Sequence, residues 1–185
     1  MNQTCDNNGI IFYNVADGET FQMSGIEFIK FPATELGTPV VAKNIAFRSR
    51  FGDNNNLRDS AVMKRMQKEI LPKIAQAVGE ENVLLFKTDL TAWDGLKPYE
   101  DLESKISLPT MDFYREHVEI FDRHKVDEWW WMATPDTAQP HGSPTWILCV
   151  APSGNLDYVG YRGCGVGGVR PFCILNSSIF GSSET

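Results

Sequence analysis

Short alternating runs of hydrophobic and polar residues fill the first 50 positions of the chain. A period of two is typical of strands that bury one face, and the runs are separated by turn dipeptides such as Asp17-Gly18 and Ser24-Gly25. The polar segment 51–56 is predicted to be a surface loop, because Asn and Asp side chains hydrogen-bond their own backbone. The predicted strands are residues 10–14, 20–23, 26–31 and 40–47.

A four-residue hydrophobic spacing begins near residue 60 and indicates a helix. Asp59 or Ser60 is expected to cap its first turn, and Gly79 is expected to end it. Pro72 is expected to kink or split the helix, because proline lacks the backbone N–H that an interior position needs. The apolar stripe consists of Val62, Met63, Met66, Ile70, Ile74 and Val78.

A second main helix is predicted over residues 110–123, with Thr110 as its N-cap and Phe113, Val118 and Phe121 facing inward. Between the helices, residues 83–86 are predicted to form a short strand and the acidic residues 98–107 a loop. Strands return in the last third, where Ser153-Gly154-Asn155 is a hairpin-turn signal. These strands are residues 129–133, 145–151, 156–160 and 169–175.

This order predicts a single α+β domain over residues 1–185, with antiparallel sheets and two main helices. It comprises N-terminal strands at 1–50, a helical middle at 59–125, and Trp-rich and Gly-rich strands at 128–180. The N-terminal and C-terminal segments are expected to meet in one antiparallel sheet system, with the helices packed against it.

The Trp-rich and Gly-rich segment contains the most distinctive residues of the chain. Neighbours in a strand point to opposite faces, so Trp129 and Trp131 should share one face and Trp130 the other. We interpret these residues and Trp146 as structural packing, with an aromatic wall of a binding groove as the alternative. Arg170 is interpreted as a structural residue that bonds backbone carbonyls or a carboxylate, and a contact to a ligand is the other possibility.

The charge balance narrows the range of partners. With 17 Lys and Arg against 24 Asp and Glu, the net charge is −7, which disfavours general nucleic-acid binding because the protein repels phosphate. No run of roughly 18 apolar residues suggests a membrane span, and no leader pattern is seen at the start, so we expect a cytoplasmic protein that does not bind membranes. Nothing in the pattern indicates an oligomeric state.

Groups for catalysis or metal binding are sparse. Cys5, Cys149, Cys164 and Cys173 form no C-x-x-C pair, so reduced thiols are expected rather than disulfides or a metal cage. The Gly-rich segment 160–168 is followed by neither Lys-Ser nor Lys-Thr, which disfavours a phosphate loop. We therefore predict no metal and no cofactor; a Cys164–His141 dyad is the sharpest enzymatic hypothesis.

The sequences W-W-W-M-A-T-P at 129–135, C-V-A-P-S-G-N at 149–155 and G-V-R-P at 168–171 resemble an uncharacterised family of clostridial and clostridial-phage proteins. Its signature is similar to W-W-x-x-(S/T)-P followed by G-V-R-P, and the similarity extends over most of the chain from Gly18 onward. A weaker resemblance links the closing strand to the C-type-lectin-like fold of formylglycine-generating-enzyme relatives and phage variable proteins. These resemblances imply a phage or prophage origin and a C-type-lectin-like fold.

We therefore expect a non-enzymatic phage or prophage-encoded binding protein that recognises a host surface glycan or a host or phage protein through its loops. It would be cytoplasmic in the bacterial host or virion-associated. Tyr158 and Tyr161 are the preferred anchors, since aromatic loop residues on a rigid scaffold are common recognition elements. The candidate ligand-binding residues are Asp136, Thr137, Gln139, His141, Asp157, Tyr158, Tyr161 and Arg162.

Two alternatives stay open. One is an intracellular phage inhibitor of a host defence, which would bind a basic protein surface or a nucleotide signal; its acidic stretch contains Asp94, Glu100, Asp101 and Glu103. The other is an enzyme related to the formylglycine-generating fold.

Overall fold

The computed structural model describes residues 3–6, 9–142, 144–160 and 165–181, and the side chains of residues 12–157 and 165–181 within them. The chain forms an α+β fold of mostly antiparallel sheets, as predicted. It has one main helix of 18 residues together with several short helices, so the expectation of two main helices is wrong. No helix in the described residues has the length and apolarity needed to cross a membrane.

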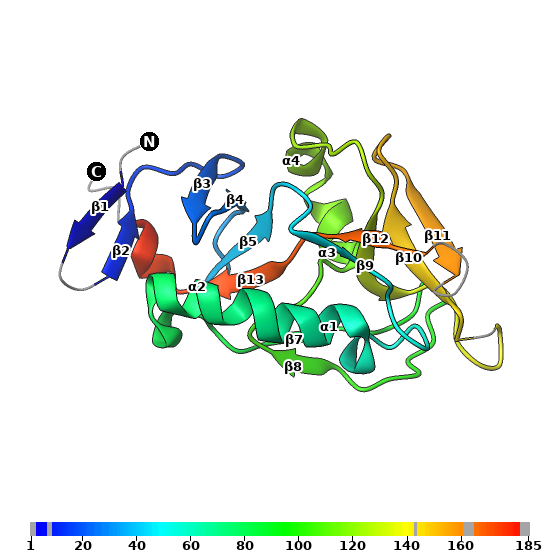
Figure 1. Cartoon of the computed structure of the whole chain (residues 1–185). Coiled ribbons are helices and arrows are strands. Elements are labelled where there is room, and N and C mark those ends of the chain that lie inside the picture. The colour runs from blue at the N-terminus through cyan, green and yellow to red at the C-terminus, as the bar shows by residue number, and fades with distance from the viewer. Residues whose placement is uncertain (1–2, 7–8, 143, 161–164, 182–185) are drawn as a thin grey trace.

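The first sheet has four antiparallel strands in the order β13-β5-β4-β3. A separate hairpin of two strands, β1 and β2, precedes it in the chain and lies at one end of the molecule (Figure 1). The bounds are β1 Gln3–Asp6, β2 Gly9–Phe12, β3 Thr20–Met23, β4 Ile26–Lys30, β5 Thr38–Ala42 and β13 Phe172–Leu175.

The second sheet has five strands in the order β11-β10-β9-β12-β6. All its pairs are antiparallel except β12 with β9, where Gly168 is opposite Trp130. Strands β10 and β11 are joined by the predicted hairpin turn, in which Gly154 has a φ of 90°. The bounds are β6 Phe47–Ser49, β9 Trp130–Pro135, β10 Trp146–Val150, β11 Leu156–Gly160 and β12 Gly167–Val169.

A two-stranded ribbon passes from one sheet to the other and joins them. One strand of the ribbon is β5 followed by β6, and the other is β12 followed by β13. The predicted continuous strands 40–47 and 169–175 are therefore each interrupted, at residues 43–46 and at Arg170-Pro171. The N-terminal and C-terminal segments meet in this ribbon, which confirms that expectation.

The main helix runs beneath both sheets (Figure 1) and consists of α1 (Ala61–Arg65), a π-helical turn η2 (Met66–Ile70) and α2 (Leu71–Val78). Ser60 caps it, because its side chain accepts a hydrogen bond from the Met63 amide at 2.9 Å. The residue after its end, Gly79, has a φ of 89°.

The π-helical turn explains how a strict four-residue spacing remains on one face. A regular α-helix has 3.6 residues per turn, so residues four apart drift by about 40° per step. The wider turn offsets that drift, and it is closed by a hydrogen bond from Leu71 N–H to Met66 O, five residues back. It lies directly before Pro72, where a split or kink was predicted. The five residues of the spacing are all buried: Val62, Met66, Ile70, Ile74 and Val78.

The predicted second helix is divided into two helices of six residues each, α3 (Met111–Glu116) and α4 (Val118–Arg123). Thr110 caps α3 as expected, through a 3.2 Å bond from the Phe113 amide. The chain leaves helical geometry at His117, whose φ is −120°. As a result Val118 is 40% exposed rather than inward, which corrects the prediction.

The remaining elements are short. The strand predicted at 83–86 begins later, at Phe86, where β7 starts. The expected loop 98–107 contains the strand β8, which pairs with β7. These elements are β7 Phe86–Thr88, β8 Leu102–Ser104 and the 3-10 helices η1 Leu57–Asp59, η3 Glu80–Asn82 and η4 Ser177–Phe180.

The residues whose side chains are described form two hydrophobic clusters, and β9 contributes to both. Trp131 is buried in the cluster that includes the main helix, with Trp129 packed against it, while Trp130 is buried in the cluster that includes Tyr114 and Phe121. The predicted alternation of the three tryptophans is therefore confirmed. Because both faces of β9 are covered, this strand lies at the centre of the fold.

Candidate functional site

A shallow groove lies where two loops approach β10 and β11. One loop joins β7 to β8 and contributes Trp93, and the other follows β9 and contributes Asp136. The groove has a volume of about 130 Å³. This is below the roughly 300–1,000 Å³ of sites that enclose a drug-sized molecule, so the groove suits one inserted group of a larger ligand. Its lining consists of Trp93, Asp136, Leu148, Leu156 and Asp157.

The carboxylate of Asp94 fastens the two loops together. Asp94 Oδ1 accepts a hydrogen bond from the Leu96 amide at 3.0 Å, and Oδ2 accepts one from the Ala138 amide at 3.0 Å. His141 Nδ1 lies 3.4 Å from Oδ2. Burial opposes ionisation of Asp94, but the two amides and His141 outweigh it and hold the pKa below its usual value. The site is thus built around an ionised carboxylate.

Asn55 also fixes the loop after β9, through hydrogen bonds separate from those of Asp94. Its side-chain amide donates to Thr137 O at 3.0 Å and to Trp146 O at 2.8 Å. Its Oδ1 accepts a hydrogen bond from the Tyr99 hydroxyl at 2.7 Å. Asn55 is completely buried, and Phe51 and Asn56 are buried too, so the prediction that segment 51–56 is a surface loop is wrong at these positions. A buried amide with all three bonds made holds the loop rigidly.

Trp93 gives the groove an aromatic wall that is open to solvent. Its side chain is 47% exposed, whereas its backbone N–H is bonded to Pro135 O at 2.8 Å. The guanidinium carbon of Arg115 lies 4.6 Å from the centre of the ring, a cation–π contact that limits the freedom of the indole. This contact favours one orientation of the ring before any ligand binds.

The groove also contains two carboxyl groups. Burial, with a smaller contribution from the negative charge of Asp94, raises the pKa of Asp136 above its usual value. Asp157 lies across the groove on β11 and is exposed. Neither Lys nor Arg is among the lining residues. The groove thus favours neutral hydrogen-bond donors or cations over anions.

The structure brings together two of the predicted site residues, Asp136 and Asp157, in this groove. His141 lies beside the groove, where it contacts Asp94, and its side chain is 56% exposed. Gln139 is exposed in the same loop. Thr137 is partly buried there. Tyr161, Arg162 and the side chain of Tyr158 lie outside the described residues, so their predicted roles stay predictions.

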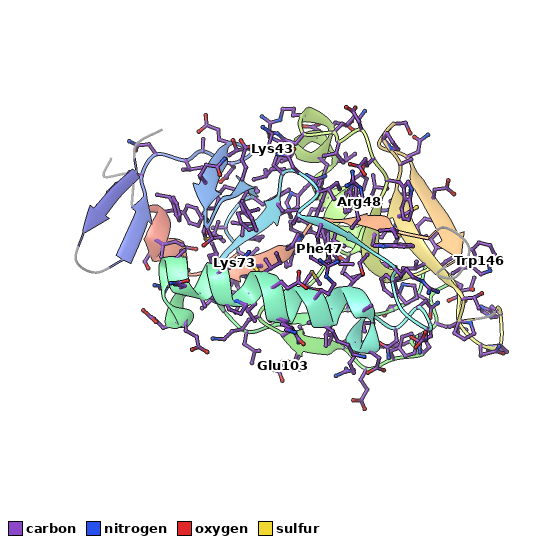
Figure 2. The ribbon with its side chains drawn as sticks, in the orientation of Figure 1. Lys43, Phe47, Arg48, Lys73, Glu103 and Trp146 are labelled. Atoms are coloured by element: carbon purple, nitrogen blue, oxygen red, sulfur yellow. The ribbon has the colours of Figure 1, made fainter. Side chains whose placement is uncertain are left out.

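Of the residues assigned to packing, Trp130 and Trp131 are fully buried and Trp129 is partly buried. Trp146 is 41% exposed and projects at the end of the molecule where β10 begins (Figure 2). Arg170 is 1% exposed, and its Nε donates to Ala42 O at 2.8 Å.

Sequence reasoning missed Trp93 and Asn55. Trp93 lies beside the turn signal Asp94-Gly95, and an aromatic residue next to such a turn is a pattern that could have identified it. Asn55 is one of three consecutive asparagines, and no sequence pattern distinguishes the buried one from its neighbours.

The described residues hold no metal-binding cluster, and the two cysteines whose side chains are described are poorly placed to act as nucleophiles. No group of three or more His, Cys, Asp or Glu side chains among them could hold a metal ion. Cys149 and Cys173 are buried, and burial raises the pKa of the Cys173 thiol, which keeps it protonated and poorly nucleophilic. Cys164 lies outside the described residues, so the Cys164–His141 dyad stays a prediction.

A larger hollow of about 590 Å³ lies beside β3, and two of its polar side chains, Glu19 and His124, are engaged within the protein. Glu19 Oε2 accepts the Ala16 amide at 3.0 Å, and His124 Nε2 is 2.8 Å from Gly18 O. The small groove is therefore the better candidate, since its aromatic wall and carboxyl groups face one space.

No protein-family model, curated protein or solved structure matches this chain. The candidate site therefore rests on the geometry of these residues.

Proposed function

We propose that this protein is a non-enzymatic, phage or prophage-encoded binding protein that recognises a host surface ligand through the groove between its loops. The observation that carries the proposal is the exposed Trp93 facing a groove with Asp136 and Asp157. Asp94 and Asn55 fix the surrounding loops. A preorganised site of this kind loses little conformational entropy on binding.

The lining favours a hydroxyl-rich, uncharged ligand, and a host surface glycan is the class that fits best. An indole ring offers an apolar platform for the C–H face of a sugar, while carboxyl oxygens accept hydrogen bonds from its hydroxyls. With no Lys or Arg in the lining, an anionic ligand would meet repulsion from two carboxyl groups. The C-type-lectin-like architecture is part of the proposal and rests on the resemblance of the closing G-V-R-P strand at 168–171.

The alternative is an intracellular inhibitor that uses an acidic surface against a basic host protein. The net charge of −7 supports it. Such binding would weaken steeply as salt is added, because it depends on exposed charges. Glycan binding in the groove would depend little on salt.

The first test is co-sedimentation of the purified protein with isolated cell-wall sacculi of a clostridium, at low and moderate salt. We expect Trp93→Ala and Asp157→Asn each to weaken retention by about tenfold, the effect of losing roughly 1.4 kcal/mol. Glu103→Gln is a matched control for charge, because Glu103 is exposed on β8 (Figure 2). Leu85→Ala is the control for apolar surface, since Leu85 is 53% exposed.

Retention that is unaffected by the groove variants would overturn the proposed site, and absence of retention would overturn the wall ligand. Binding to one basic cytosolic protein that disappears at moderate salt would favour the inhibitor instead.

A further inference from the structure

Arg170 is a buried cation with incomplete hydrogen bonding, far along the chain from the loops of the groove. Its Nε donates to Ala42 O, whereas Nη2 has no hydrogen-bond partner among the described residues. The side chain is 1% exposed. Buried guanidinium groups normally satisfy their donors, because an unmade hydrogen bond to a charged group is costly.

The positive charge of Arg170 is also uncompensated. The described residues form no ion pair with it. Its guanidinium carbon lies 4.9 Å from the ring centre of Trp130 and 5.5 Å from that of Phe121, so aromatic faces supply part of the stabilisation. Burial lowers the pKa of Arg170 to about 10, which still leaves it protonated at neutral pH. A negative charge nearby would therefore be strongly stabilised.

A small pocket of about 10 Å³ lies beside this arginine. Its lining includes Lys125 and no carboxylate, and its aromatic walls are Tyr114, Phe121 and Trp130. The Tyr114 hydroxyl donates to Gly154 O at 2.6 Å, which closes the pocket on the side of the β10–β11 turn. The space is enough for one small guest, such as a water molecule or a single halide ion that seats against the guanidinium.

We propose that this pocket is a binding site for a small monovalent anion of the halide class, held by Arg170 with support from Lys125. A halide would have two effects here: it would accept a hydrogen bond from Nη2, which has no partner among the described residues, and it would neutralise the buried charge. A water molecule would accept the same bond but leave the charge unbalanced. The Lys125 side chain is 45% exposed, so it adds positive charge at the outer side of the site. Asp122, 3.3 Å away, balances part of that charge.

The pocket lies at the junction between the two sheets, so a bound anion would affect that junction. Arg170 lies in the link where the chain leaves β12 in one sheet and enters β13 in the other, and it is bonded to the end of β5. An anion here would stabilise the junction between the sheets. This inference is independent of the proposed groove, and its test does not use a groove ligand.

Crystals grown with sodium bromide test the site directly. We expect an anomalous bromine peak within hydrogen-bonding distance of Arg170 Nη2. A water molecule at that position, with no bromine signal, would overturn the proposal.

Thermal unfolding tests the same site in solution. The melting temperature of the wild-type protein should rise with potassium bromide relative to potassium gluconate at equal ionic strength. Lys125→Met should raise the bromide concentration of half effect by about threefold, as expected for loss of one partly exposed charge. Lys73→Met, on the exposed side of the main helix (Figure 2), should leave it unchanged. Arg170→Met should abolish the difference between the salts if it folds; equal melting temperatures in both salts for the wild type would contradict the site.

Discussion

At the scale of single residues, two polar side chains organise the candidate site. Asn55 joins three groups from separate segments, and Asp94 joins two loops through the amides of Leu96 and Ala138. Most of their bonds are to backbone groups, so they determine where the loops lie rather than what they bind. Trp93 and Asp136 then face the groove because the chain around them is fixed.

The hydrogen bonds to Asp94 should make the loops sensitive to acid. Because the folded protein lowers its pKa, Asp94 contributes stability above the ordinary pKa of about 3.9, and this contribution is lost as the pH falls through the folded value. The amide proton of Ala138, followed by NMR, should therefore titrate with a midpoint below that of a model aspartate. Asp94→Asn should remove the titration, whereas Asp53→Asn, at an exposed position, should preserve it. An Ala138 amide that is insensitive to pH in the wild type would contradict this role.

At the scale of elements, close contacts between neighbouring segments restrict two positions of β12 to glycine. The indole of Trp129 and the side chain of Ile45 occupy the space that Cβ atoms at Gly167 and Gly168 would need. The Gly-rich β12 therefore lets β9 and its tryptophans pack onto the backbone. In the main helix, packing also changes the local geometry: the π-helical turn keeps apolar residues spaced four apart in contact with the core.

Replacing Pro72 tests which feature causes that turn. Removing proline from an ordinary helix interior gains about 3 kcal/mol, because a lost hydrogen bond and a steric clash are relieved. If the spacing of Met66 and Ile70 requires the turn, Pro72→Ala should change the free energy of unfolding in urea by less than about 1 kcal/mol. A gain near the full value would show instead that proline imposes the turn. Gln76→Ala, at an exposed position of the same helix, is the control.

At the scale of the whole molecule, the two sheets share a ribbon and the main helix lies beneath both (Figure 1). The ribbon crosses between the sheets at residues 43–46 and at Arg170-Pro171. Both chain segments that link the sheets run side by side, with β5 paired to β13 in one sheet and β6 paired to β12 in the other. The two hydrophobic clusters are therefore expected to form one cooperative unit, in line with the single domain predicted from the sequence.

Equilibrium unfolding checks this cooperativity. Far-ultraviolet circular dichroism reports mainly on the helix and sheets. Tryptophan fluorescence reports on five residues, three of which, Trp129 to Trp131, lie in or next to the central strand β9. The two transitions in urea should coincide, with one midpoint and one slope. Two separated midpoints would show that the sheets unfold independently.

The sequence by itself determined the elements whose signals are local. The alternation around Ser24-Gly25, the helix cap at Asp59 or Ser60 and the alternating faces of Trp129 to Trp131 depend on neighbours within a few residues. The structure confirms the two alternations and shows that Ser60 is the cap. The α+β class follows from their order. The length of the second helix was predicted wrongly, because the break at His117 has no proline or glycine to mark it.

Only the tertiary structure decided what surrounds the groove and Arg170. Trp93 and Asp157 are 64 positions apart in the sequence and meet because β9, β10 and β11 pair beside the loop after β7. Asn55 is buried because the carbonyls of Thr137 and Trp146 come within its reach. Arg170 keeps a donor with no partner among the described residues, because the walls around it are aromatic. These features depend on contacts between distant segments, and no local pattern encodes them.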